Sequence, residues 1–531
     1  MTGLTEARCL RRRASALLVV VLVASSAAAN EPSVLDAAFD ETLQRYKPQG
    51  LAVGIVQDGK VVYLRTAGEL VAGEGRPVDA DTLFKIASNT KSMTTATLAR
   101  LVDAGKLRWD DPVIKHLPQF RMHDPWVTRE MQVRDLLIHN SGLRAGAGDL
   151  MLWPEPNAFD RGDVIRGLRH LKPIHSFRSH YDYDNLLYIV AGEVAAAAGG
   201  ATYETLVRRE VFEPLGMTRC QVGAWNRDRV GNVAQPHTRQ GTRNVPFRRD
   251  GVNIPRTTMD AAGGIRCSLK DMLTWVQAWL EPDERWISTE QRAALWSAHT
   301  PMPVTARQRA WNDTQFSAYG YGWRLIDVAG EFNVAHTGSL AGMYSYVTLV
   351  PGKKVGFVIL TSGDGDEARV VLNQVLLRHF TSPRPHATTA YYADFLAREA
   401  SDTPASAKAP NTSTRRRVPA SDISAALGVY RDAWFGEVSV CPDGDGVRFV
   451  SSKSPRLDGM IMGVGERLLI DWSDATVDAE AWVTFAPARG SGPARMTMAK
   501  VDPGADFSFD FEDLAFERLR DCDEARAAQG E

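Results

Sequence analysis

Apolar positions near the start of the chain follow first a helical and then an alternating pattern. Four apolar residues recur at three- and four-residue spacing: Leu35, Phe39, Leu43 and Tyr46. This spacing predicts a helix with one buried face. Two β-rich runs follow at residues 51–57 and 60–66, with Asp58-Gly59 between them. An Asp-Gly pair between two such runs is typical of a tight turn, so the sequence predicts a β-hairpin after the helix.

Helical patterns fill the middle of the chain, and strand-like patterns return near residue 350. A helix is predicted to begin near Ser88 and to end at Gly105. Further helical stretches are expected at Val133–Ile138, Leu186–Ala198 and Leu269–Leu280. The apolar runs Tyr346–Val350 and Val355–Thr361 flank a Pro-Gly turn and predict two strands. Strands at both ends with helices between them indicate one α+β domain whose sheet unites the two ends.

A second domain is indicated by a change of composition after this region. Residues 401–418 are rich in Ser, Thr, Pro and Ala and include three consecutive arginines, which is typical of a linker. Beyond it, four short alternating runs are separated by turn residues: Gly436–Val440, Val447–Val450, Arg467–Asp471 and Ala481–Phe485. Runs of this length and spacing predict a small all-β barrel or sandwich.

The first 29 residues have the pattern of an export signal. Four arginines, at positions 8, 11, 12 and 13, precede an apolar stretch from Ala14 to Val23, and small residues follow up to Ala29. This order predicts a signal peptide that is cleaved after Ala29. The apolar stretch is shorter than the ~20 residues that span a bilayer, which favours export over anchoring. We therefore expect a secreted or periplasmic chain with domains at 30–385 and 419–525, joined by a helix and linker at 386–418.

Composition and charge narrow the classes of function. Among 531 residues, 44% are apolar and 24% are charged, which is typical of a packed globular protein and not of a disordered one. Lys and Arg number 62 against 64 Asp and Glu, for a net charge of −2. A net charge this close to zero produces no overall electrostatic field that would attract nucleic acid or a membrane surface. We therefore expect neither as a partner.

The cysteines suggest disulfides and not a metal site. Without the signal segment four remain: Cys220, Cys267, Cys441 and Cys522. In an oxidising compartment two disulfides are expected, and the local pairings 220–267 and 441–522 are the simplest of three connectivities. Four buried free thiols are the alternative. No CxxC spacing is present, and we expect no metal and no cofactor.

Three short motifs carry candidate chemistry. Ser88-Asn-Thr-Lys91 opens a predicted helix, where residues three apart share a face, so the lysine amine can approach the serine hydroxyl. A serine hydroxyl is a weak nucleophile until a neighbouring base takes its proton. Tyr183-Asp-Asn185 follows about a hundred residues later, and His336-Thr337-Gly338 lies near the end of the first domain.

In this order the three motifs resemble those of the serine β-lactamase and penicillin-binding-protein superfamily. The chain is most similar to its class C-like branch of D-alanyl-D-alanine carboxypeptidases, D-aminopeptidases, esterases and β-lactamases. Other blocks carry the same resemblance: Phe84–Leu107, Asp110–Val113, Leu136–Leu143, Pro214–Met217, Ala262–Ile265 and Tyr321–Trp323. It covers about residues 34–380 and implies a β-lactamase/transpeptidase-like fold. More loosely, residues 420–520 resemble the lipocalin-like barrel appended to such hydrolases.

The resemblance implies a role for each motif residue. Ser88 would be the acylated nucleophile, and Lys91 the base or proton relay. Tyr183 would share that duty as phenolate or proton shuttle, while Asn185 binds Lys91 or a substrate amide. Thr337 and Gly338 would contact substrate. The backbone N–H groups of Ser88 and Ser339 would form the oxyanion hole. The barrel would wall the cleft, mediate oligomer contacts in a homo-oligomer, or only stabilise the chain.

His336, which we expect to belong to the catalytic set with Ser88, Lys91 and Tyr183, stands where many penicillin-targeted relatives carry lysine. A histidine is about half protonated near pH 6.5, so recognition of a substrate carboxylate is placed in doubt. The expected activity is hydrolysis of small peptides with D- or unusual residues, such as cell-wall peptides or linearised cyclic peptides, through an acyl-enzyme on Ser88. A carboxylesterase or weak β-lactamase is the alternative. A protein that is acylated as a sensor and does not turn over is the more remote one.

Overall fold

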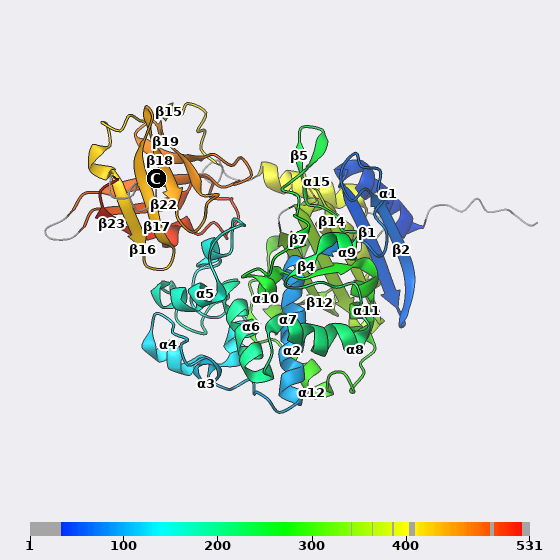
Figure 1. Cartoon of the computed structure of the whole chain (residues 1–531). Coiled ribbons are helices and arrows are strands. Elements are labelled where there is room, and N and C mark those ends of the chain that lie inside the picture. Colours follow the sequence, from blue (N-terminus) through cyan, green and yellow to red (C-terminus); the bar gives the residue numbers. More distant parts are fainter. Residues whose placement is uncertain are drawn as a thin grey trace, which may run out of the picture.

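The computed structural model describes residues 33–340, 342–363, 365–384, 387–402, 409–488 and 493–522. The predicted signal segment, residues 1–29, lies outside the described residues. Within them, an α+β domain is followed by a β-barrel (Figure 1). No single helix of the described ranges is long and apolar enough to cross a membrane, although the bent pair Leu186–Gly199 and Tyr203–Leu215 passes that test jointly.

An eight-stranded sheet forms the centre of the first domain, in the order β2-β1-β14-β13-β12-β11-β10-β9. Its strands are β1 (Gly50–Gln57), β2 (Lys60–Gly68), β9 (Thr300–Pro301), β10 (Ser317–Tyr319), β11 (Arg324–Val328), β12 (Glu331–Leu340), β13 (Met343–Val350) and β14 (Val355–Ser362). β1 pairs antiparallel with β14 over its full length. The predicted hairpin and the union of the two ends in one sheet are thus confirmed.

Helices cover both faces of this sheet. Alternate residues of β1, such as Leu51 and Val53, pack with α1 (Val34–Tyr46), α14 (Asp366–Thr381) and α15 (Thr389–Ser401). The intervening residues face α11 (Leu269–Leu280), and a Cβ on Gly54 would lie 2.7 Å from Leu273 of that helix. A strand buried on both faces reads as a continuous apolar run, which is why β1 shows little alternation in its burial.

Most of the remaining elements of this domain pack on the α11 face of the sheet, whereas Trp311 of α13 (Ala306–Asn312) packs against α15 on the opposite face. The helices are α2 (Thr90–Asp103), α3 (Val113–His116), α4 (Pro125–Glu130), α5 (Arg161–Gly167), α6 (Leu186–Gly199), α7 (Tyr203–Val207), α8 (Glu213–Leu215), α9 (Arg227–Val230), α10 (Asp260–Gly263), α12 (Thr289–Leu295) and α13 (Ala306–Asn312). Short strands are β3 (Leu83–Lys85), β4 (Trp225–Asn226), β5 (His237–Gln240), β6 (Arg243–Pro246), β7 (Asn253–Ile254) and β8 (Arg266–Ser268). The predicted helical stretch at 133–138 is the 3-10 helix η2 (Val133–Leu137), at whose start the Asp135 carboxylate accepts from the Gln132 N–H at 2.8 Å.

The C-terminal barrel closes with eight strands. They are β16 (Gly428–Asp432), β17 (Gly436–Asp443), β18 (Gly446–Ser451), β19 (Asp458–Val464), β20 (Arg467–Trp472), β21 (Ala481–Ala486), β22 (Arg495–Lys500) and β23 (Ala515–Arg520). Closure follows because β19 pairs with both β18 and β20, and the short β15 (Arg416–Arg417) lies beside β19. The four predicted runs fall on β17, β18, β20 and β21, so the all-β expectation is confirmed as a lipocalin-like barrel.

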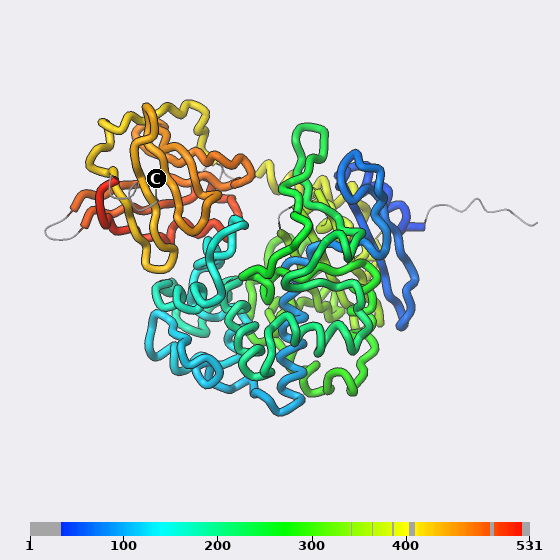
Figure 2. The backbone as a smooth tube through the Cα atoms, viewed as in Figure 1, coloured from blue at the N-terminus to red at the C-terminus, as the bar shows by residue number. Residues whose placement is uncertain are grey.

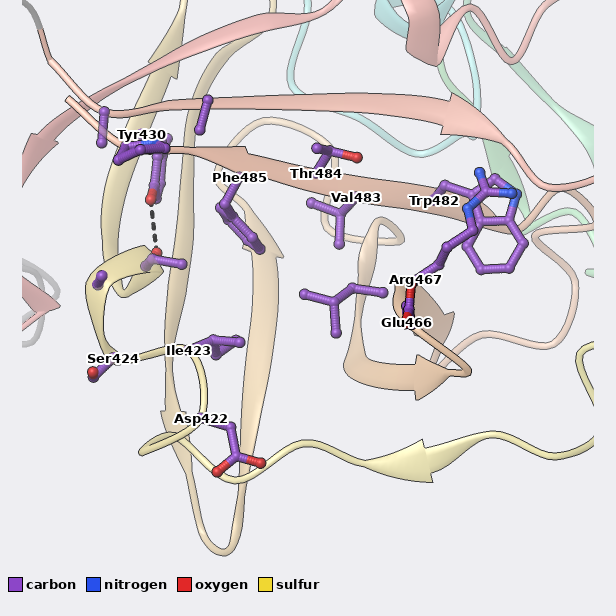
Figure 3. Close-up of a pocket in the computed structure, with 16 residues that line it drawn as sticks. Asp422, Ile423, Ser424, Tyr430, Glu466, Arg467, Trp482, Val483, Thr484 and Phe485 are labelled. Carbon is purple, nitrogen blue, oxygen red and sulfur yellow. Dashed lines mark hydrogen bonds between the residues drawn. The ribbon is translucent and has the colours of Figure 1, made fainter. Parts of the chain in front are cut away.

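The barrel rests on residues 145–165 of the first domain, the cyan segment beneath it in Figure 2. Lys453 forms an ion pair with Asp163 at 2.8 Å, and the Phe159 and Phe435 rings lie 5.6 Å apart. Elsewhere on the barrel, a separate pocket of about 450 Å³ lies between residues 422–426 and strands β20 and β21 (Figure 3). Its lining includes none of the motif residues predicted from the sequence.

Candidate active site

Ser88 and Lys91 meet at the start of α2. Ser88 lies in the 3-10 turn η1 (Ala87–Asn89), which continues directly into the helix. One helical turn places the Lys91 ammonium nitrogen, Nζ, 3.2 Å from the Ser88 hydroxyl oxygen. The spacing in the sequence therefore produces the contact that serine activation needs.

Lys91 is fully buried, and its surroundings favour the neutral amine. Its Nζ donates to the Asn185 side-chain carbonyl at 2.7 Å and to the Ala262 backbone carbonyl at 3.0 Å. Burial lowers the pKa of Lys91 to about 7, against the opposing charges of Asp149 and Asp184. A large fraction of the amine is therefore neutral near pH 7 and able to accept the proton of Ser88.

Tyr183 lies beside the lysine at the entry to α6. Lys91 Nζ lies 4.8 Å from the centre of its ring. Burial raises the pKa of Tyr183, although a hydrogen bond with Ser88 acts in the opposite direction. The phenol is therefore protonated near neutral pH. This favours Lys91 as the base and leaves Tyr183 the role of proton shuttle.

The third motif lies on β12, next to the nucleophile turn. A Cβ on Gly338 would lie 2.1 Å from the backbone carbonyl oxygen of Ile86, so only glycine lets the strand approach this closely. Thr337 and Ser339 line the same cleft as Ser88. The Ser339 hydroxyl also accepts a hydrogen bond from Arg369 at 2.8 Å. The arrangement brings together the two residues whose N–H groups were expected to form the oxyanion hole.

His336 differs from the sequence expectation. Its side chain is buried and is not part of the cleft lining. Its Nδ1–H donates to the Thr337 carbonyl at 2.7 Å, and the Tyr319 hydroxyl donates to its Nε2 at 2.8 Å. Burial, together with Arg324 and Lys91, lowers the pKa of His336 well below its usual value. The imidazole is therefore neutral at pH 7, not half protonated near pH 6.5, and it supports β12 instead of presenting a charge to the cleft.

Arg324 supplies the cation that His336 does not, and sequence reasoning missed it. It follows Tyr321-Gly-Trp323 directly and lines the cleft with Ser88, Thr337 and Ser339. No hydrogen bond or ion pair joins its guanidinium to another residue of the described ranges, and its charge lies 5.8 Å from the Tyr183 ring centre. Arg324 directly follows the Tyr321–Trp323 block that carries the family resemblance, and this position could have identified it as a candidate site residue.

Both domains build the cleft, which has a volume of about 820 Å³. The barrel contributes Arg456, Thr476, Asp478, Asp506, Phe507, Ser508 and Phe509. Three roles were expected for the barrel, and the structure shows the first of them: the barrel forms part of the cleft wall. Nothing in the alternating strand pattern indicated this, because these residues lie in loops between barrel strands.

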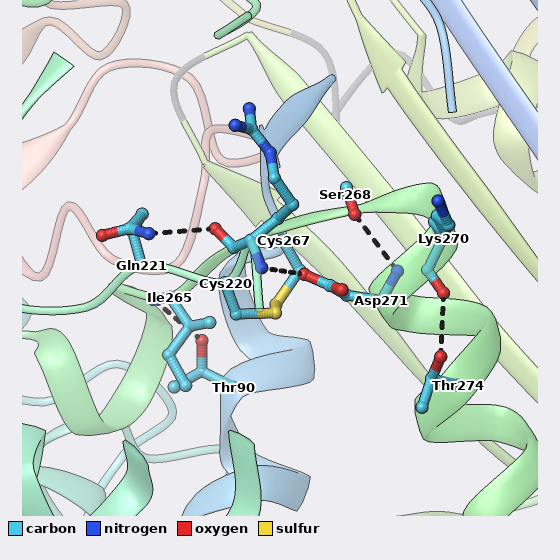
Figure 4. Close-up of a disulfide and its surroundings, with 10 residues drawn as sticks. Thr90, Cys220, Gln221, Ile265, Cys267, Ser268, Lys270, Asp271 and Thr274 are labelled. Carbon is cyan, nitrogen blue, oxygen red and sulfur yellow. Dashed lines mark hydrogen bonds between the residues drawn. A yellow bond between two sulfur atoms is a disulfide. The ribbon is translucent and has the colours of Figure 1, made fainter. Parts of the chain in front are cut away.

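The Cys220–Cys267 disulfide lies near Thr90, the first residue of α2 (Figure 4). Cys267 belongs to β8, which pairs with β3, and the backbone N–H of Ile265 donates to the Thr90 hydroxyl at 3.3 Å. The second pair joins Cys441 of β17 to Cys522. No cluster of three or more metal-ligating side chains occurs in the part of the chain that the structure describes.

The first domain is similar to a known family and to several known proteins. A family model described as Beta-lactamase matches residues 35–379. An unguisins hydrolase of Aspergillus campestris is 27% identical over 61% of this chain and 60% of its own length. Penicillin-binding protein 4 of Amycolatopsis lactamdurans is 27% identical over 61% of this chain and 84% of its own. The chain thus spans less than two thirds of the fungal relative.

One solved structure is similar over both domains. It is the octameric penicillin-binding protein homologue from Pyrococcus abyssi, with a TM-score of 0.58 and 20% identity. The match covers 91% of this chain and 98% of that one. At this identity the likeness concerns the fold alone, and it extends to the α+β domain together with the barrel.

Proposed function

The chain belongs to the beta-lactamase family of serine hydrolases, and we propose that it hydrolyses amide bonds of small peptides through an acyl-enzyme on Ser88. The observation that carries this proposal is the buried Lys91 amine, which lies 3.2 Å from the Ser88 hydroxyl and has a pKa lowered to about 7. A base of this kind is what a serine nucleophile requires at neutral pH.

Acylation follows from the positions of these groups. Neutral Lys91 takes the proton of Ser88, and the serine oxygen attacks the carbonyl carbon of the scissile amide. The N–H groups of Ser88 and Ser339 stabilise the negative oxygen of the tetrahedral intermediate. The intermediate collapses as the C–N bond breaks, and the leaving nitrogen receives the proton from Lys91 through the Tyr183 hydroxyl. An ester on Ser88 and a free amine result.

Deacylation uses the same groups in reverse. A water molecule in the position of the departed amine gives a proton, through Tyr183, to neutral Lys91 and attacks the ester carbonyl carbon. Collapse of the second intermediate breaks the bond to Ser88, and Lys91 returns the proton to the serine oxygen. The products are a carboxylic acid and the regenerated enzyme, and no net proton stays on the protein.

The position of Arg324 in the cleft supports the proposal that the substrate has a free carboxylate near the scissile bond. A guanidinium that lines a cleft and lacks an anionic partner among the described residues fits a carboxylate with two parallel hydrogen bonds. The names of the relatives, an unguisins hydrolase and a penicillin-binding protein, support peptides with D- or unusual residues as the substrate class. We therefore place peptides with a free C-terminal carboxylate ahead of simple esters.

The test combines covalent labelling with turnover. Purified residues 30–531 are incubated with a fluorophosphonate and then with D- and L-aminoacyl p-nitroanilides, short peptides, p-nitrophenyl esters and nitrocefin. Labelling at Ser88 with release of amide products supports the peptidase. Turnover of esters alone would instead assign a carboxylesterase, and a stable acyl adduct would assign a sensor. The Ser88→Ala variant must lose the label while keeping its circular dichroism spectrum.

We also propose export and self-association. The charged, apolar and small-residue order of residues 1–29 supports secretion, and N-terminal sequencing of the exported protein should begin at Asn30.

The octameric state named for the Pyrococcus abyssi homologue supports a homo-oligomer. Light scattering coupled to gel filtration measures the molar mass, and a mass of one chain would refute self-association.

A further inference from the structure

A loop of the barrel holds the turn that lies next to the catalytic lysine. This turn is the 3-10 segment η3 (Asp149–Met151) of the first domain. The Asp510 carboxylate, from the loop between β22 and β23, accepts hydrogen bonds from the N–H groups of Gly148 at 2.5 Å and Leu150 at 3.0 Å. These two donors flank Asp149 in the chain, so the barrel fixes the backbone on both sides of that residue.

A chain of hydrogen bonds runs from the same loop to Lys91. The Ser508 hydroxyl donates to Asp149 Oδ2 at 2.8 Å, and the Asn185 amide nitrogen donates to the same oxygen at 2.8 Å. The carbonyl end of Asn185 then accepts from Lys91 Nζ at 2.7 Å. Asp149 is fully buried, and in the described residues no other side chain donates to its carboxylate.

The chain of bonds decides which end of Asn185 faces the lysine. An asparagine side chain can turn over, and its NH₂ group would then point at the ammonium of Lys91 and remove an acceptor. Ionised Asp149 prevents this, because a carboxylate only accepts hydrogen bonds and so pairs with the NH₂ end. Ser508 in turn fixes the carboxylate, since it supplies the second of the two donors.

We propose that Asp149 and the barrel residue Ser508 are positioning residues for the catalytic lysine, so that the second domain completes the active site of the first. The inference rests on the proposed function, because it assumes that Lys91 activates Ser88. It goes beyond that function in giving the barrel a part in the chemical step.

The same chain of bonds affects the proton equilibrium of Lys91. The titratable and charged groups that face Lys91 and Asp149 are Asp184, Asp510, Arg324, Tyr183, Tyr188, His139 and His336. Burial raises the pKa of Asp149, and the bonds from Asn185 and Ser508 lower it. Without the Ser508 hydroxyl, Asp149 takes up a proton more readily and stabilises the lysine ammonium less. The pKa of Lys91 then falls, and the acidic limb of the activity profile moves to lower pH.

The experiment compares Ser508→Ala, Ser508→Thr and Asp149→Asn with the full-length wild type and a control. The control is Ser452→Ala, which removes an exposed barrel serine that bonds only the Glu437 backbone carbonyl. The kcat and KM of a p-nitroanilide substrate and the rate of fluorophosphonate labelling are measured from pH 5 to 9. Melting temperature is recorded for each variant.

The expected outcome separates positioning from folding. Ser508→Ala should lower kcat about tenfold, as the loss of one hydrogen bond predicts, with KM within about twofold. Its acidic limb, and that of Asp149→Asn, should lie at lower pH than in the wild type. Ser508→Thr should keep most of kcat, and Ser452→Ala all of it.

Two outcomes would overturn the inference. The first is Ser508→Ala with the kcat and pH profile of the wild type. The second is a loss of kcat only in proportion to a loss of folded protein, without a shift of the acidic limb. A wild type that is neither labelled at Ser88 nor active would instead refute the proposed function, so the two failures are distinguishable.

Discussion

The ring of Phe507, a barrel residue, lies edge-on to the ring of Tyr183 with the two centres 5.7 Å apart. The backbone of Phe507 also approaches Gly146 so closely that a Cβ there would lie 2.6 Å from its carbonyl oxygen. Gly146 has a positive φ of 74°, which glycine adopts without strain. The aromatic wall above the proton shuttle therefore comes from a domain that begins more than 200 residues after Tyr183 in the sequence.

Removing this wall should weaken substrate binding more than chemistry. Phe507→Ala should lower kcat/KM about fivefold, mainly through KM, because an aromatic contact contributes ~1 kcal/mol. Steady-state kinetics with a series of p-nitroanilides checks this. The matched control is Phe332→Ala, which removes a phenylalanine of similar exposure, 41% against 40%, outside the cleft. Equal effects of the two variants would contradict the interpretation.

The pH dependence of acylation should report the pKa of Lys91. Because the reactive form is the neutral amine, the labelling rate should rise as pH increases through about 7 and fall roughly tenfold per unit below it. Lys91→Met should remove this limb together with nearly all labelling. Stopped assays with a fluorophosphonate between pH 5 and 9 provide the measurement. A rate that still rises about tenfold per unit up to pH 9, without levelling off above pH 7, would show that the lysine is charged at neutral pH.

Much of the fold could be predicted because its signals are local or periodic. The hairpin around Asp58-Gly59 and the helix after Ser88 depend on turn chemistry and on spacing within one element. The helical stretch expected at 133–138 is a 3-10 helix over 133–137, and its type was not evident because one 3-10 turn has nearly the same apolar spacing as one α-helical turn. The barrel was recognised as all-β, whereas its closure depends on the pairing of β19 with β20, which no strand reveals alone.

The site was predictable only as far as its residues lie within short motifs. Ser88 and Lys91 are one helical turn apart, so their contact follows from spacing. Arg324 and Ser508 act through tertiary position, and neither lies within a motif. The state of His336 could not be derived from its sequence neighbours, since it depends on the buried Tyr319 hydroxyl and on the charges of Arg324 and Lys91.

Arg324 should decide between substrates with and without a free carboxylate. Arg324→Gln should lower kcat/KM for peptides with a free C-terminal carboxylate by ten- to a hundredfold, the range expected for a charge-assisted hydrogen bond of about 1.5–3 kcal/mol. The same peptides with an amidated C-terminus should change little. Arg285→Gln is a suitable control, because that side chain is 91% exposed and pairs only with Asp283. Equal losses for both forms of the peptide would refute carboxylate recognition.

The two disulfides should differ in their effect on catalysis although their effects on stability are similar. They close segments of 47 and 81 residues, for which chain entropy predicts about 4 and 4.5 kcal/mol of stabilisation. Only Cys267 lies on β8, where it pairs with Phe84 of the strand that leads to Ser88. Cys220→Ala/Cys267→Ala should therefore lower the labelling rate at 25 °C about tenfold, while Cys441→Ala/Cys522→Ala should lower the melting temperature by a similar amount and leave that rate unchanged. Thiol titration of the unreduced wild type must first yield no free thiols among these four, since reactive thiols would indicate four unpaired cysteines. Equal labelling rates in the two double variants would show that the Cys220–Cys267 disulfide does not affect the reactivity of Ser88.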